Sequence, residues 1–139
     1  FSVLIPWAAH EGNLNNPVLF FCWLGTVFWT FGFDTVYALA DKEYDQKIGV
    51  NSSAINLGSH AKTTIQICYL TASISLAICS ILSKLGIIFW PIWIITSILM
   101  QKDVKKIFKS EDLSLTKISR HFKNQVIYGT LILIGIIIG

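Results

Sequence analysis

Long stretches without any charged side chain are the feature that most constrains how this chain folds. Residues 17–33 and 63–82 carry no Asp, Glu, Lys or Arg, and neither do residues 87–100 and 126–139. Only 14% of the 139 residues are charged, whereas soluble domains carry about 25%. Apolar segments of this length are typical of helices that lie in lipid. The sequence therefore predicts an all-α fold, a polytopic transmembrane helix bundle.

The apolar stretches divide the chain into about four to five membrane spans. Residues 1–9 look like the end of a helix, and Pro17 suits the first position of the next helix, where its missing N–H costs nothing. A helix over residues 17–40 reaches about 36 Å, enough for a bilayer core of about 30 Å. The further spans are expected at residues 63–82, 87–100 and 126–139.

Basic residues are distributed unevenly between the polar segments. Residues 41–62 and 101–123 together hold ten of the eleven Lys and Arg residues, and the remaining one is Lys84. Because basic loops stay on the cytoplasmic side of a membrane, we expect both segments to lie in the cytoplasm or its equivalent. No Lys or Arg precedes Lys42, so the chain has no basic face for nucleic acid.

Three aspartates near the end of the first long span share one face of the expected helix. Residues advance about 100° each around an α-helix, so Asp41 and Asp45 both lie within roughly 20° of Asp34. Glu43 points to roughly the opposite side. An aspartate at membrane depth indicates a functional site, and oxygen ligands suit a hard ion such as Mg²⁺ shared with a phosphorylated substrate.

The aspartates also allow two interpretations that involve no phosphorylated substrate. In one, Asp41 and Asp45 are simply solvated acids at a helix end. In the other, the chain is a transporter or channel subunit that binds a cation or proton through Asp34 and Asp41. If a phosphorylated substrate does bind, Lys42 and Lys47 hold phosphate oxygens beside the aspartates.

Residues 34–54, DTVYALADKEYDQKIGVNSSA, resemble the second aspartate-rich motif of the UbiA family of membrane prenyltransferases. The resemblance is greatest to the 4-hydroxybenzoate polyprenyltransferases in that family. Around the motif, a Trp-Ala-Ala loop, a Phe-Trp-Thr-Phe-Gly-Phe run and residues 121–125, similar to an F-x-N stretch, follow the family's order. We therefore expect residues 1–139 to be a fragment, the C-terminal half of a UbiA-type domain. The missing N-terminal half would carry the first aspartate-rich motif.

The resemblance implies a bundle of about nine spans in which two aspartate-rich loops face one cytoplasmic cavity. Asp41 and Asp45 would be the metal-binding pair, and Asp34 the catalytic acid upstream that joins them. The implied reaction is Mg²⁺-dependent transfer of a polyprenyl group from polyprenyl diphosphate to an aromatic acid, 4-hydroxybenzoate, in ubiquinone-type quinone biosynthesis. Homogentisate, a naphthoate and a porphyrin-derived compound are alternative acceptors. A bacterial inner membrane is favoured over a mitochondrial inner membrane, with the aspartate-rich loop on the cytoplasmic side.

Three further residues are candidates for substrate contacts. Tyr37 is placed to stabilise an allylic cation with its ring face, and packing between helices is the alternative. Asn124 is either a substrate contact or a helix cap. His121 is close to Asn124 in the sequence. It either lies near the diphosphate or is a polar residue at the start of a helix.

Overall fold

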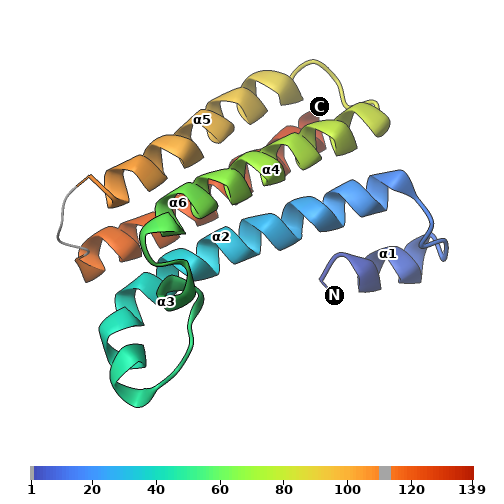
Figure 1. Ribbon diagram of the computed structural model, residues 1–139. Coiled ribbons are helices and arrows are strands. Elements are labelled where there is room, and N and C mark those ends of the chain that lie inside the picture. The colour runs from blue at the N-terminus through green and yellow to red at the C-terminus, as the bar shows by residue number, and fades with distance from the viewer. Residues whose placement is uncertain (1, 110–113) are drawn as a thin grey trace.

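The computed structural model describes residues 2–109 and 114–139, and these residues form a bundle of helices (Figure 1). The four long helices are α2 (Pro17–Ile48), α4 (Ala61–Leu82), α5 (Phe89–Ile107) and α6 (Leu115–Ile138). The short elements are α1 (Leu4–His10), α3 (Ser53–Leu57) and the 3-10 turn η1 (Gly58–His60). The predicted all-α bundle is confirmed.

Local sequence sets both ends of α2. The side chain of Asn16 accepts a hydrogen bond from the backbone N–H of Val18 at 2.8 Å, and Pro17 occupies the first helical position. At the other end Gly49 adopts a φ of 76°, in the left-handed region that favours glycine. The helix therefore begins where the sequence predicts and stops at a glycine.

Helix α2 is longer than the predicted span. Its 32 residues rise about 48 Å, well beyond a bilayer core of about 30 Å. The polar segment expected from residue 41 onward is therefore helical as far as Ile48. This extension keeps Asp41 and Asp45 on the same continuous helix as Asp34, which the spacing argument requires.

Three segments in the described part of the chain are long and apolar enough to cross a membrane: Pro17–Ile48, Ser53–Leu82 and Leu115–Ile138. The expected number was four to five. The stretch predicted as a span at residues 87–100 belongs to α5, which continues into charged residues and does not meet the same criterion. Pro91 lies in the first turn of α5, where proline removes no interior hydrogen bond.

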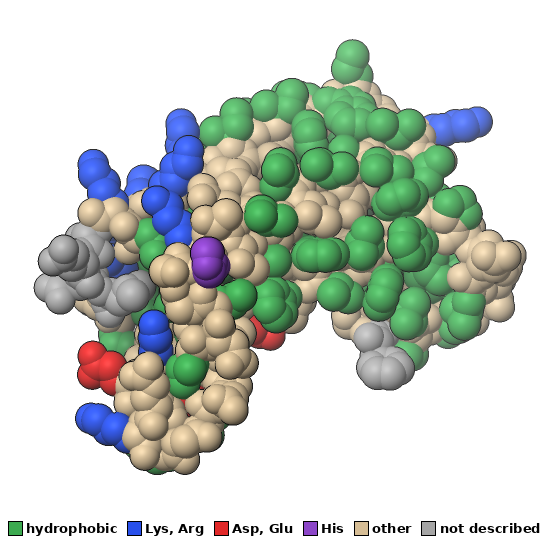
Figure 2. Space-filling view, in the orientation of Figure 1, with side chains coloured by type: hydrophobic (Ala, Val, Ile, Leu, Met, Phe, Trp, Pro, Cys, Tyr) green, Lys and Arg blue, Asp and Glu red, His purple; other side chains and the backbone are tan. Residues whose placement is uncertain are grey.

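The polar segment predicted at residues 101–123 is largely helical where the structure describes it. Its start completes α5 and its end begins α6, while residues 110–113 lie outside the described residues. Figure 2 shows Lys and Arg side chains gathered at this end of the bundle, with hydrophobic side chains over much of the remaining visible surface. The exposed apolar side chains, such as Ile74 and Ile95, agree with a lipid-facing surface.

The four long helices form a closed ring of contacts. Helix α2 packs against α4, α4 against α5, and α5 against α6, whereas α6 returns to α2 over a smaller contact. Gly32 lets α2 and α4 approach closely, since a Cβ atom there would lie 2.9 Å from Cε1 of Tyr69. The smaller α2–α6 contact leaves open the side of the bundle on which the candidate site lies.

Candidate functional site

A groove of about 500 Å³ between α2 and α6 brings the three predicted aspartates together. Asp34, Asp41 and Asp45 all line it, and Glu43 does not. The other lining residues are Phe33, Tyr37, Ala38 and Phe122. The helical spacing therefore places the aspartates on a common surface, as predicted. We call this surface the aspartate groove.

The carboxylates of the aspartate groove are accessible. Asp34 and Asp41 are exposed, and Asp45 is half-buried. No three His, Cys, Asp or Glu side chains among the described residues converge closely enough to hold a metal ion. Mg²⁺ in proteins is usually bound by one or two carboxylates, with substrate phosphates and water completing its coordination. The oxygen donors present thus fit a Mg²⁺ ion shared with a phosphorylated ligand.

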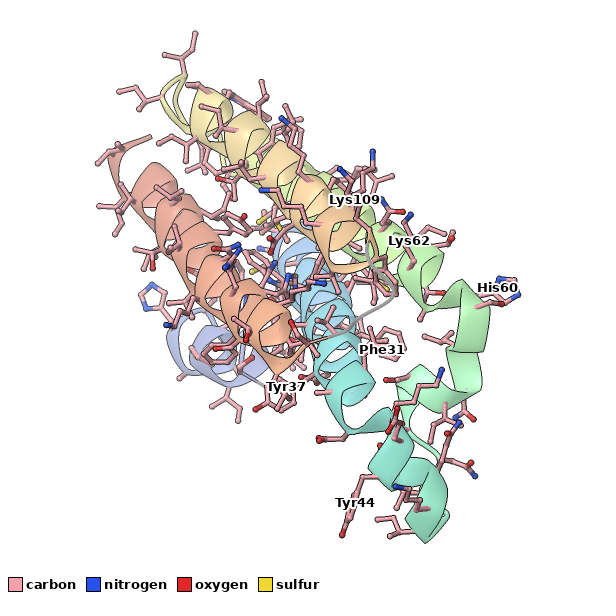
Figure 3. All side chains as sticks on the ribbon, turned by 90° about the vertical axis from the view of Figure 1, so that its left-hand side faces the viewer. Phe31, Tyr37, Tyr44, His60, Lys62 and Lys109 are labelled. Atoms are coloured by element: carbon pink, nitrogen blue, oxygen red, sulfur yellow. The ribbon has the colours of Figure 1, made fainter. Side chains whose placement is uncertain are left out.

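The predicted substrate contacts on α2 fall in different surroundings. Tyr37 lines both the aspartate groove and an adjoining groove of about 400 Å³ that reaches the start of α6. Figure 3 shows Tyr37 on the side of α2 that faces α6, whereas Tyr44 points away from the bundle. Lys42 is half-buried, Lys47 is exposed, and neither lines the aspartate groove. The roles of these side chains stay predictions.

A second hollow adjoins the aspartate groove farther along α2 and α6. It has a volume of about 330 Å³. Its lining residues are Thr26, Trp29, Thr30, Phe33, Phe122, Gln125 and Val126. The rings of Phe33 and Phe122 lie 5.5 Å apart and line both hollows. This ring pair lies between the second hollow and the carboxylates. We call the second hollow the aromatic pocket.

A buried polar network joins α4, α5 and α6 beside the aromatic pocket. Nδ1 of His121 lies 2.7 Å from Oδ2 of Asp103, and Nε2 of His121 lies 2.8 Å from the hydroxyl of Tyr69. The other Asp103 oxygen accepts a hydrogen bond from Nδ2 of Asn124 at 2.9 Å. With a neutral imidazole, His121 donates from Nδ1 to the carboxylate and accepts the Tyr69 proton at Nε2.

The network changes the interpretation of two residues from the sequence. Asn124 lies well inside α6, whose N-cap is Ser114, so the helix-cap alternative is wrong. Its amide binds Asp103, and its predicted contact with substrate stays untested. His121 is 2% exposed, so the polarity of a helix start does not account for it either.

Sequence reasoning missed Asp103 and Tyr69 altogether. Asp103 lies in a segment interpreted as a polar loop. Tyr69 lies in an apolar run, where the sequence gives no reason to assign a tyrosine a particular role. One pattern could have exposed the network. The buried residues of α6 recur at helical spacing, and they are Ile118, His121, Gln125, Tyr128, Ile132 and Gly135. Extending the last span toward Leu115 would have placed His121 on that buried stripe.

Comparison with known proteins agrees with the motif and the fold. The model of the UbiA prenyltransferase family matches residues 1–125. A 4-hydroxybenzoate solanesyltransferase of Synechocystis sp. is 51% identical over 67 residues, which cover 48% of this chain and 23% of that protein. A 4-hydroxybenzoate octaprenyltransferase of Vibrio campbellii is 31% identical over 141 residues, covering 99% of this chain and 48% of that protein. No solved structure matches the chain.

The chain thus spans about half the length, or less, of these curated relatives. The family match nevertheless includes α2, with all three groove aspartates, and most of the described residues. The helical bundle, its apolar spans and the aspartate-rich α2 agree with that match. On this evidence the chain belongs to the UbiA prenyltransferase family.

Proposed function

We propose that the protein containing this chain transfers a polyprenyl group from polyprenyl diphosphate to an aromatic acid, and that the acid is 4-hydroxybenzoate. The observation that carries the proposal is the aspartate groove, in which Asp34, Asp41 and Asp45 face one open surface on α2. The names of the two relatives described above, both 4-hydroxybenzoate prenyltransferases, support the choice of acceptor. In this proposal the chain is the C-terminal half of the enzyme, and the other half supplies the first aspartate-rich motif.

The groove suits the diphosphate of the donor. Mg²⁺, when bound, would neutralise diphosphate charge and favour its departure. Asp41 and Asp45 would hold that ion, and Asp34, about two helical turns earlier, would complete the acidic surface. Lys42 and Lys47 lie on the same helix, and they would bind phosphate oxygens when the donor approaches from solvent.

The reaction proposed is an electrophilic substitution on the acceptor ring. The allylic C–O bond of the donor breaks, and its electron pair leaves with the diphosphate. The ring carbon ortho to the acceptor's hydroxyl forms the new C–C bond and then loses its proton to solvent. Tyr37, which lines the groove beside the aspartates, presents an aromatic ring to the developing allylic cation.

We place the protein in a bacterial inner membrane, with the aspartate groove on the cytoplasmic side. Three apolar segments support a multi-pass protein, and the basic residues at one end of the bundle support the orientation. Both relatives described above are bacterial, which supports a bacterial over a mitochondrial membrane. The prenylated acid would then enter ubiquinone-type quinone biosynthesis.

A direct test uses membranes that contain the full-length protein. They are incubated with radiolabelled polyprenyl diphosphate and with 4-hydroxybenzoate, homogentisate or a hydroxynaphthoate, each with Mg²⁺ or with EDTA. We expect a labelled lipid product with 4-hydroxybenzoate that is lost with EDTA and returns with added Mg²⁺. A product with only another acid would reassign the acceptor. No product with any acid would overturn the proposed activity.

A further inference from the structure

Two cysteines from different helices meet where α2 packs against α4. Cys22 lies in the second turn of α2, and Cys79 lies in the last turn of α4. Their thiols are hydrogen-bonded to each other, and both side chains are half-buried. Hydrogen-bonded thiols are already in contact, so a disulfide between them requires only a small further approach of the two sulfur atoms.

A glycine one turn after Cys22 brings the two helix backbones close together. A Cβ atom on Gly25 would lie 3.4 Å from the backbone oxygen of Ala72 and 3.4 Å from Cβ of Ser75. A disulfide needs Cα atoms about 4.4–6.8 Å apart, whereas the axes of packed helices usually lie about 8–10 Å apart. Because Ser75 lies one turn before Cys79, the two cysteines are next to the place where the helices approach most closely enough for a disulfide.

The cysteine pair lies at the end of the bundle opposite the gathered Lys and Arg side chains. Figure 1 shows the start of α2 and the end of α4 together at one end, with α3 and the start of α6 at the other. Cys79 also hydrogen-bonds the side chain of Ser83, the first residue after α4. In the orientation proposed above, this end faces the periplasm, which is an oxidising compartment where disulfides form and persist.

Resting on the proposed function and its membrane orientation, we propose that Cys22 and Cys79 form a disulfide that ties α2 to α4 at the periplasmic end of the bundle. The oxidant is a disulfide carried by a periplasmic protein. The thiolate of one cysteine attacks a sulfur of that disulfide, and the second cysteine then attacks the mixed disulfide that results. The two thiols are oxidised to one S–S bond, and the oxidant leaves as a dithiol that carries their two protons.

The bond stabilises the position of α2, the helix that carries the aspartate groove. Helix α6 contacts α2 over a smaller area than α4 does, so α4 is the main support of α2. A disulfide between residues 22 and 79 closes a long loop, and such a bond stabilises the folded protein mainly by restricting the unfolded chain. The proposed disulfide therefore holds the two helices together at the end opposite the carboxylates.

The third cysteine of the chain is a matched control. Cys68 also lies on α4, but it packs against Gly32 of α2 instead of against a second cysteine. The full-length protein is produced in cells that have a periplasm, and its thiols are trapped with acid and alkylated. The unreduced protein is then digested, and its peptides are identified by mass spectrometry. The same procedure is applied to Cys22→Ser, Cys79→Ser and Cys68→Ser.

We expect most of the unmodified protein to give a peptide pair joined through Cys22 and Cys79, with Cys68 alkylated. Reduction should separate the pair. The pair should persist in Cys68→Ser and be absent from the other two variants. In detergent, reduction should lower the Tm of the unmodified protein by about 5 °C more than it lowers the Tm of Cys22→Ser.

Prenyl transfer is measured in membranes from the same cells, so the disulfide and the proposed activity are tested separately. Alkylation of Cys22 and Cys79 in most of the protein would overturn the disulfide, and prenyl transfer by those membranes would leave the proposed function standing. Joined peptides from membranes that prenylate no aromatic acid would support the disulfide and overturn the proposed function.

Discussion

Nδ1 of His121 lies 2.7 Å from Oδ2 of Asp103, and both side chains are almost fully buried. The pair links α6 to α5, and Tyr69 extends the link to α4. A buried polar group is costly when it has no hydrogen-bond partner, and losing Asp103 leaves the donors of His121 and Asn124 unpaired. The pair is therefore the point at which a single substitution should most disturb the position of α6.

Replacing Asp103 should destabilise the bundle. Asp103→Ala removes the acceptor of both His121 and Asn124, and we expect the free energy of unfolding to fall by about 1–3 kcal/mol for each donor left unpaired. Thermal unfolding of the full-length protein in detergent would show the change as a lowered Tm. Lys102→Ala is the control, since Lys102 is the neighbouring residue on α5 and is exposed. Similar Tm values for the two variants would contradict a stabilising role for the network.

Carboxylates that line the aspartate groove should contribute more to kcat than a carboxylate outside the groove. We expect Asp41→Ala and Asp45→Ala each to lower kcat by about 100-fold or more, because each removes a charge placed to hold Mg²⁺ and diphosphate. Glu43→Ala should change kcat by less than about threefold. Radiolabel transfer in membranes gives the rates, and immunoblotting shows whether each variant is inserted. Equal losses at all three positions would contradict the assignment of a single functional face.

Two glycines should respond in opposite ways to the same substitution. Gly32→Ala puts a Cβ atom 2.9 Å from the Tyr69 ring, and we expect it to cost about 1–3 kcal/mol through overpacking. Gly129 has no atom within 4 Å of its Cβ position, so Gly129→Ala should be neutral or should stabilise α6 by up to about 1 kcal/mol. Equilibrium unfolding in detergent measures both changes. A Tm for Gly32→Ala at or above that of the unmodified protein would show that α2 and α4 are packed less tightly than described.

The membrane orientation predicts opposite accessibility at the two ends of the bundle. Single cysteines replace Lys84 or Lys109 in a variant whose Cys22, Cys68 and Cys79 are alanine. Lys84 follows α4, and Lys109 follows α5 at the basic end. In intact bacterial cells with permeabilised outer membranes, an impermeant maleimide should label position 84 and not position 109. The reverse pattern would place the aspartate groove on the outer side.

The sequence predicted the helical class and the aspartate face because both depend on residues close together in the chain. Asp34, Asp41 and Asp45 lie on one helix, so their alignment follows from the helical repeat alone. Three of the described segments are long and apolar enough to cross a membrane, and α5 continues from the apolar residues 87–100 into charged residues. One of these, Asp103, bonds to His121 of α6.

What the sequence alone determined is that this chain lies in a membrane as helices and carries a stripe of carboxylates at the end of one of them. What only the tertiary structure decided is which distant residues meet. Trp29 and Gln125 are 96 residues apart, and Tyr69 and His121 are 52 apart. Their hydrogen bonds depend on how four helices pack and rotate against one another. Local spacing contains no information on that packing, so the aromatic pocket and the buried network appear only in the folded bundle.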